Sequence, residues 1–264
     1  MNHFVREPAV AGTFYPAEKT ELEKMLNVFL EGERPKIQGK IRALLVPHAG
    51  YIYSGPVAGK AFRLLPPAKK ETKVILLGPA HTRGFPGASV SRMDAWQTPL
   101  GNVAIHPDSK RIIGPEIQNI EEAHFQEHCL EVQLPFLQMT LGKFSIVPII
   151  AGMTDPTALS KEIEKMMGRD DLLVISSDLS HYLAYAKAKE TDQKTIKAIM
   201  DLDVEEMDAI GDACGKTPIL TLIEIAKKKK WTPRLLDYCN SGDTAGDPKR
   251  VVGYAAMVFS EESK

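Results

Sequence analysis

Short apolar runs recur along the chain, and most show little alternation between apolar and polar residues. Such runs are typical of strands that are buried on both faces, as in a mainly parallel sheet. Each therefore predicts a central strand. The five clearest are "IRALLV", "KVILLG", "FSIVPII", "DLLVIS" and "VVGYAAMVF", which begin at residues 41, 73, 144, 171 and 251.

Amphipathic helical stretches lie between these runs. Strands that alternate with helices predict one α/β domain over residues 1–264, with a mainly parallel or mixed central sheet flanked by helices. No repeat or linker divides the chain. The predicted helices cover residues 18–31, 128–141, the stretch from the Asp155-Pro156 cap to Gly168, residues 188–202, and a helix that starts at Pro218 with Thr217 as its N-cap.

Three of the predicted strands are each followed closely by a histidine. "IRALLVPH" ends in His48, "KVILLGPAH" ends in His81, and "DLLVISSDLSH" ends in His181, with Asp178 three residues earlier. Ligands of such sheets bind beyond the carboxyl ends of the strands. If the strands are parallel, the three histidines share one site, where imidazole serves as a metal ligand or as an acid or base.

A catalytic metal site usually has a third protein ligand, and a thiolate or a carboxylate would complete a pair of histidines. Cys214 precedes the helix near Pro218, where the helix dipole and Lys216 favour a thiolate. Cys239 follows another potential strand and competes with Cys214 on spacing alone. Cys129 lies in a helical pattern, which favours packing in the core.

The segment around Cys129 carries two further polar candidates, His128 and Glu131. They are one helical turn apart, so they would share a face if the segment is helical. We interpret them as residues that support a ligand or contact substrate, or else as ordinary residues of a polar face.

Composition narrows the classes of function. The chain has 44% hydrophobic residues and a net charge of −1, so it lacks the basic footprint of a nucleic-acid-binding protein. Its apolar runs are too short to span a membrane, and the N-terminus lacks a signal-peptide core. Three widely spaced cysteines do not form a disulfide framework. We therefore expect a cytoplasmic protein that binds neither nucleic acid nor membrane.

Six short motifs together resemble the Memo family, which also belongs to the AmmeMemoRadiSam group. They are "AVAGTFYP", "PHAGYIYSGP", "LLGPAH", "EHCLEVQLPF", "SSDLSHY" and "CGKTPI", in the family's order and approximate spacing over nearly the whole chain. The resemblance implies a fold similar to that of class III extradiol dioxygenases. It also implies that His48, His81 and Cys214 are metal ligands, with His181 and Asp178 as catalytic residues beside them.

The implied function is a metal-dependent redox enzyme of the non-heme iron class, acting on a small molecule or a peptide. Fe(II) is the expected cofactor, with Cu and Zn as alternatives. Extradiol dioxygenases use two histidines and a carboxylate, so a cysteine in the third position means that catechol cleavage is not carried over. Two alternatives remain: a non-catalytic module that binds a phosphorylated peptide or another anion in the same cleft, and a zinc-type hydrolase.

Overall fold

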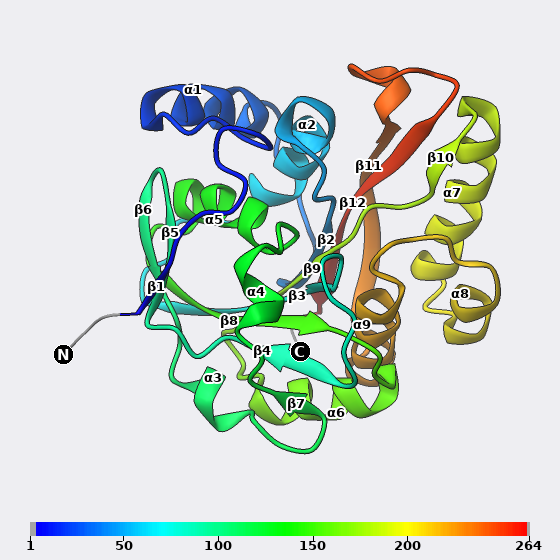
Figure 1. Cartoon of the computed structure of the whole chain (residues 1–264). Coiled ribbons are helices and arrows are strands. Elements are labelled where there is room, and N and C mark those ends of the chain that lie inside the picture. The colour runs from blue at the N-terminus through cyan, green and yellow to red at the C-terminus, as the bar shows by residue number, and fades with distance from the viewer. Residues whose placement is uncertain (1–3, 263–264) are drawn as a thin grey trace.

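A nine-stranded mixed sheet runs through the centre of the molecule, and helices cover both of its faces (Figure 1). The computed structural model describes residues 4–262. The strands follow the order β10 (His181–Leu183), β12 (Val251–Glu261), β2 (Lys40–Val46), β9 (Leu172–Ser176), β3 (Thr72–Pro79), β8 (Phe144–Ala151), β4 (Ala88–Val90) and β7 (Ile117–Gln118), and β11 (Thr232–Asn240) also pairs with β12.

The four central strands β2, β9, β3 and β8 are parallel to one another. β12 and β4 are antiparallel to the strands that they join at either side of this block. The predicted α/β fold with a mainly parallel or mixed sheet is therefore confirmed, in its mixed form. A separate three-stranded sheet contains β1 (Val5–Arg6), β5 (Ala95–Thr98) and β6 (Gly101–Ala104).

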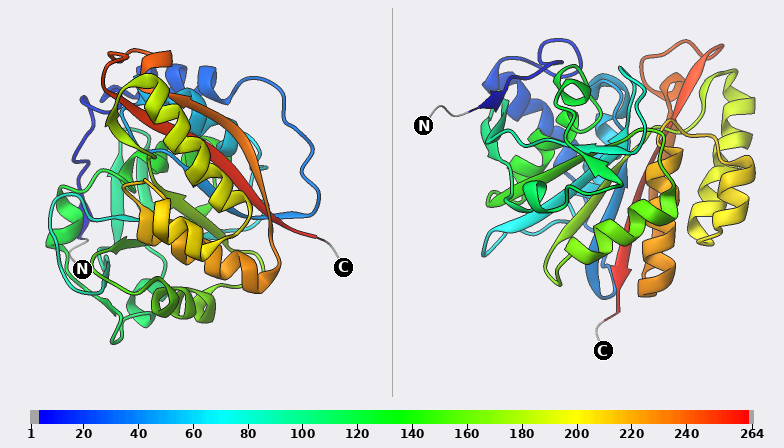
Figure 2. Two further views of the ribbon diagram at one scale, coloured as in Figure 1. Left: turned by 90° about the vertical axis from the view of Figure 1, so that its right-hand side faces the viewer. Right: turned by 60° about the horizontal axis from the view of Figure 1, so that its bottom comes forward.

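The helices form two layers, as Figures 1 and 2 show; the left view of Figure 2 looks onto the layer that contains α7 and α9. One layer contains α1 (Lys19–Leu30), α2 (Tyr51–Phe62) and α5 (Leu134–Thr140). The other contains α6 (Pro156–Met166), α7 (Tyr185–Met200) and α9 (Lys216–Lys229), with α8 (Val204–Ile210) packed against α7 and α9. The short elements are α3 (Asp108–Arg111), α4 (Glu122–Phe125), and the 3-10 turns η1 (Glu131–Gln133) and η2 (Ser241–Asp243).

Side chains of the central strands alternate between two hydrophobic clusters, one on each face of the sheet. In β2, Leu44 and Val46 join one cluster, whereas Ala43 and Leu45 join the other, and all four are buried. This alternation follows from the two-residue period of a strand. Because both faces are covered, the strands need apolar residues at every position, which is why their sequences lack polar alternation.

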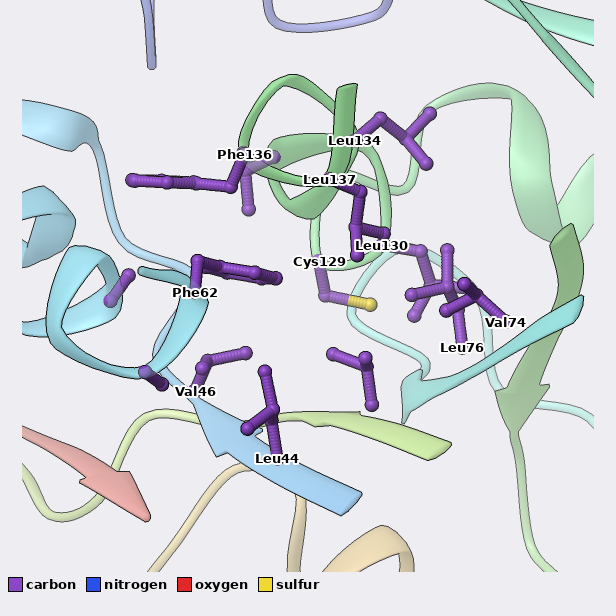
Figure 3. Close-up of a cluster of buried hydrophobic side chains, with 14 of the residues drawn as sticks. Leu44, Val46, Phe62, Val74, Leu76, Cys129, Leu130, Leu134, Phe136 and Leu137 are labelled. Carbon is purple, nitrogen blue, oxygen red and sulfur yellow. The ribbon is translucent and has the colours of Figure 1, made fainter. Parts of the chain in front are cut away.

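Cys129 lies in the first of these clusters, as the sequence pattern indicated. Figure 3 shows its side chain among the leucine, valine and phenylalanine side chains that the cluster contributes. The thiol is fully buried, and burial is the main cause that raises its pKa well above the ordinary value. Cys129 therefore packs in the core, and its Sγ also lies within 4.8 Å of donor atoms of His81 and Glu127.

Two local predictions were wrong. Residues 128–141 do not form one helix, because a 3-10 turn at Glu131–Gln133 precedes α5. Thr217 is not an N-cap either, since α9 begins at Lys216 and Gly215 occupies the cap position. Asp155 does cap α6, where its side chain accepts a hydrogen bond from the Thr157 N–H. Within residues 4–262, no helix combines the length and the apolar character that crossing a membrane requires.

Candidate metal centre

The carboxyl ends of three parallel strands meet at one edge of the sheet. β2 and β3 both pair with β9, which lies between them. His48 follows β2 by two residues and His81 follows β3 by two residues, while His181 begins β10, five residues after β9. Parallel strands all end on the same side of a sheet, so three separate segments bring histidines to one place.

Three imidazoles converge at this edge: His48, His81 and His128, which we call the histidine cluster. Each offers one nitrogen atom, and these nitrogens lie within 4.8 Å of one another. The ring centroids of His48 and His81 are 5.0 Å apart, and those of His81 and His128 are 4.7 Å apart. The sequence pattern placed His128 beside the ligands, whereas the fold places it among the atoms that could bind an ion.

Cys214 approaches the cluster from the segment before α9. Its Sγ lies 3.1 Å from His48 Nε2 and accepts a hydrogen bond from the Asp178 N–H at 3.3 Å. Zinc binds nitrogen at about 2.0–2.1 Å and sulfur at about 2.3 Å. Atoms 3.1 Å apart are therefore near enough to contact one ion. Cys214 itself is not among the wall residues of the cavity or the donor groups within 4.8 Å, so its link to the cluster is the contact with His48. Cys239 lies on β11, opposite Tyr254 of β12, and no contact of its thiol with a histidine is found among residues 4–262.

The predicted thiolate character of Cys214 was wrong for the metal-free chain. Burial, followed by the nearby carboxylate of Asp178, raises the pKa of Cys214 to about 12. The ammonium group of Lys216 does not offset these effects, because it binds the main-chain oxygen of Asp208 instead. Without an ion the sulfur is a thiol, since a coordinating cation is what removes the proton from such a group.

A buried carboxylate supports His81 from behind. Both oxygens of Glu127 accept hydrogen bonds from His81, one from its backbone N–H at 2.7 Å and one from Nδ1 at 2.9 Å. Burial by itself would raise the pKa of Glu127, but its hydrogen bonds to His81 and the proximity of His128 lower it to about 2. A carboxylate that binds the far nitrogen of a metal-ligating histidine is a recurrent feature of metal sites.

The donor set fits a transition-metal ion. Burial, with the nearby histidines second, lowers the pKa of His48 well below its ordinary value, and burial also lowers the pKa of His128. Neutral imidazole is the form that binds metals. Two or three imidazoles with one sulfur suit zinc, copper or iron, and are a poor match for magnesium or calcium, which prefer oxygen ligands.

Asp178 and His181 lie beside the cluster but are not part of it. Asp178 is buried, and one of its oxygens accepts the His48 backbone N–H at 2.7 Å. Burial raises the pKa of Asp178 to about 7, against the effect of the backbone hydrogen bonds from His48 and Ala49. Burial lowers the pKa of His181. Near pH 7 the imidazole of His181 is therefore neutral and can accept a proton, whereas Asp178 is present in both protonation states and can give or take one.

A cavity of about 510 Å³ opens in front of these residues. Its walls include the histidine cluster, Asp178 and His181, together with Phe14 and several tyrosines. Tyr182 stands at this cavity with 64% of its surface exposed and a backbone φ of 60°, which is unusual for a bulky residue. The Arg250 guanidinium lies 5.0 Å from the centre of the Tyr182 ring and also lines the cavity.

Glu131 is directed away from this cavity. Its two oxygens accept hydrogen bonds from Arg6 Nη1 at 2.7 Å, from the Tyr15 hydroxyl at 2.7 Å, and from the backbone N–H groups of Ala9 and Val10. All of these donors belong to the N-terminal segment. We therefore assign Glu131 to the anchoring of residues 6–15, and not to the support of a ligand.

Sequence reasoning missed two residues whose side chains form hydrogen bonds with the imidazoles of the histidine cluster, Glu127 and Ser176. Ser176 Oγ lies 2.9 Å from His48 Nδ1. Glu127 directly precedes His128, so an acid beside a candidate histidine was a signal that could have been used. Ser176 is the last residue of β9 and reads as an ordinary strand residue, so its role depends on the pairing of β9 with β2.

Comparison with known proteins gives consistent matches. The family model described as Memo-like protein matches residues 6–258. A MEMO1 family protein of Aquifex aeolicus is 42% identical over 97% of this chain and 99% of its own length. One from Sulfolobus acidocaldarius is 40% identical over 97% and 100%, respectively.

Among solved structures, an uncharacterized protein of Escherichia coli matches with a TM-score of 0.54 at 12% identity. The match covers 84% of this chain and 100% of that one, and it concerns the fold alone. The family model and the relatives, by contrast, match in sequence over nearly the whole chain. On this basis the chain belongs to the Memo family.

Proposed function

We propose that the protein is a metal-dependent redox enzyme of the non-heme iron class, with His48, His81 and Cys214 as the metal ligands. The observation that carries the proposal is the approach of Cys214 Sγ to His48 Nε2, at 3.1 Å, beside the converging nitrogens of the histidine cluster. Fe(II) is the proposed ion, with copper and zinc as alternatives. A ferrous ion at this position would supply electrons to dioxygen, and an oxidisable substrate or a reductant would replace them.

His128 is the competing third ligand. Its nitrogen meets the same distance criterion as those of His48 and His81, whereas Cys214 is in none of the groups that meet it among residues 4–262 and contacts His48. We assign the position to Cys214, because a thiolate neutralises part of the charge of a divalent ion and imidazole does not. His128 then lies beside the ion, with its ring 4.7 Å from that of Phe14, where it would contact a ligand in the cavity.

Asp178 and His181 would move protons in the proposed reaction. The pKa of Asp178 is raised to about 7 by burial, so its carboxyl group exists in both protonation states near neutral pH. His181 lines the same cavity outside the histidine cluster and would accept or donate a proton at its imidazole. The apolar and aromatic walls around them would exclude water and strengthen these interactions.

One observation favours the second candidate, a module that binds an anion. Arg250 lines the cavity, and the contact found for its guanidinium among the described residues is the face of Tyr182. An arginine placed in this way could form paired hydrogen bonds with a carboxylate or a phosphate. The same arginine would serve an enzyme whose substrate is anionic, so turnover must separate the two functions.

Metal content after anaerobic purification tests the proposal. We expect about one iron per chain in the unsubstituted protein and a loss of iron in His48→Ala, His81→Ala and Cys214→Ala. Cys239→Ala is the matched control, because it removes a partly buried thiol for which no contact with His48, His81 or His128 is found among residues 4–262, whereas Cys214 Sγ contacts His48. His128→Ala should retain the metal, and loss of the metal in this variant together with retention in Cys214→Ala would make His128 the third ligand.

Oxygen consumption separates the candidate functions. The iron-loaded protein should consume O2 in the presence of a reductant and an oxidisable substrate, whereas the zinc-loaded protein should not. His181→Ala should keep the metal and lose turnover. Iron-loaded protein that binds phosphate or a phosphorylated peptide, with no O2 consumption above that of Cys214→Ala, would favour the binding module.

A further inference from the structure

We propose that Ser176 and Glu127 are positioning residues that hold His48 and His81 in the same tautomer, with the proton on Nδ1 and the lone pair of Nε2 directed into the site. The proposal rests on the proposed metal centre for its purpose. The tautomers themselves are a property of the metal-free chain and can be measured without any ion.

The hydrogen bonds of Ser176 leave one arrangement of protons. Ser176 Oγ lies 2.6 Å from the carbonyl oxygen of Cys129, which can only accept, so the hydroxyl proton points there. The side-chain NH2 of Gln133 donates to the same Oγ at 2.9 Å. A hydroxyl has one proton to donate and two lone pairs. The third contact, with His48 Nδ1 at 2.9 Å, must therefore carry its proton on the imidazole.

The side-chain amide of Gln133 keeps these proton positions in place, because its own orientation is fixed. Its amide nitrogen also donates to the carbonyl oxygen of Pro47 at 2.9 Å, and the side chain is fully buried. A flipped amide would place its oxygen against the carbonyl oxygen of Pro47. The NH2 group must consequently face Ser176, so Gln133 cannot accept the serine proton, and the carbonyl oxygen of Cys129 at 2.6 Å takes it.

Glu127 fixes His81 by a different chemistry. The carboxylate has no proton to donate, and it lies 2.9 Å from His81 Nδ1, so the proton of this hydrogen bond belongs to the imidazole. The Glu127 side chain is fully buried and also accepts the backbone N–H groups of His81, His128 and Cys129. These four hydrogen bonds hold the carboxylate in place.

The two supports should give the histidines unequal donor strength. An anionic acceptor behind His81 raises the basicity of its Nε2 more than a neutral hydroxyl does behind His48. The Nε2 atom of His48 faces Cys214 Sγ at 3.1 Å. In the metal-free chain, hydrogen bonds therefore run in one direction, from the Cys214 thiol through His48 and Ser176 to the Cys129 carbonyl.

Nitrogen-15 NMR of the metal-free protein labelled at histidine tests the tautomers, with assignments from single histidine variants. We expect His48 and His81 to carry protons on Nδ1 and bare Nε2 atoms. In Ser176→Ala the buried Nδ1 of His48 loses its acceptor, so the proton should move to Nε2, where Cys214 sulfur accepts it. The signals of His81 should stay unchanged, and Ser176→Thr, which keeps the hydroxyl, should restore the original pattern of His48.

Zinc affinity, measured by competition with a chelating dye, gives the second readout. Ser176→Ala and Glu127→Gln should each bind Zn(II) about 10- to 100-fold more weakly, whereas Ser160→Ala, at a buried serine on α6, should bind it normally. A proton on Nε2 of His48 in the unsubstituted protein, or unchanged tautomers and unchanged affinity in Ser176→Ala, would overturn the proposal. The expected tautomers without zinc binding would support the positioning role and refute the metal centre.

Discussion

The hydrogen-bond network around Glu131 allows a direct test of whether this residue anchors the N-terminal segment, residues 6–15, and does not support the metal site. The perturbation is Glu131→Gln, which keeps the shape of the side chain and removes its charge. One carboxylate oxygen accepts from Arg6 and Ala9, and the other accepts from Tyr15 and Val10. Both side chains of the Arg6–Glu131 ion pair are almost completely buried, with 2% and 0% of their surfaces exposed.

The expected cost follows from what glutamine cannot do. Its NH2 group must face one of the two pairs of donors, which leaves at least one N–H, of Val10 or of Arg6 and Ala9, without its acceptor. The other partner of the broken ion pair, Arg6, keeps its charge in the interior, although the carbonyl oxygens of His124 and Glu127 still accept from it. Removing one partner of a buried ion pair costs about 3–5 kcal/mol.

Removal of the tyrosine hydroxyl alone should cost less. Tyr15→Phe deletes one hydrogen bond of 2.7 Å to a charged acceptor and leaves the other three in place. A hydrogen bond to a charged group contributes about 1.5–3 kcal/mol. Because the Tyr15 hydroxyl donates directly to Glu131, Tyr15→Phe and Glu131→Gln perturb the same hydrogen bond, so their combined effect should be smaller than the sum.

Chemical and thermal denaturation measure these differences. For a protein of this size, about 3–5 kcal/mol corresponds to a fall in Tm of roughly 6–20 °C. Glu122→Gln, an identical change at an exposed glutamate, is the control and should stay within about 0.5 kcal/mol. Zinc affinity should be retained in Glu131→Gln. Unchanged stability together with weaker zinc binding would refute the anchoring role and return Glu131 to the surroundings of the metal.

Two further predictions concern other buried groups. Burial, followed by the charge of Arg6, lowers the pKa of His124 to about 3. Below pH about 6.5 the unfolded chain then binds a proton at His124 that the folded chain does not, so the free energy of unfolding should fall by about 2 kcal/mol between pH 7.5 and pH 5. His124→Gln should reduce the dependence of this free energy on pH. Parallel pH profiles of the two proteins would contradict the prediction. A Cβ at Gly253 would lie 2.0 Å from an oxygen of Asp192, so Gly253→Ala should lower Tm by several degrees. The substitution should also disturb the loop before His181, because Gly253 forms backbone hydrogen bonds with Leu179 and Ser180. An unchanged Tm and unchanged His181 NMR signals would show that Asp192 moves aside freely.

The sequence alone predicted the central architecture and one side of the candidate site. Apolar runs without alternation identified β2, β3, β8, β9 and β12, because strands covered on both faces need apolar residues throughout. Parallel strands share the edge at which they end, and this geometric rule placed His48, His81 and His181 near one another. The short strands of the second sheet lack such runs and were missed.

Tertiary structure decided the remainder. Glu127 and Ser176 bind the histidines through contacts that span 46 and 128 positions along the chain, and local pattern carries no signal of such pairs. Glu131 was interpreted from its spacing to His128 on one helix, but it is the first residue of a 3-10 turn, and its carboxylate binds donors in residues 6–15. For Cys214, the sequence shows the helix that follows, whereas the protonation of the thiol depends on how deeply the folded chain buries it. The positions of strands and helices follow from short-range periodicity in the sequence. Hydrogen-bond partners and the burial of charged groups depend on packing between distant segments, and the pattern of residues within one segment does not reveal that packing.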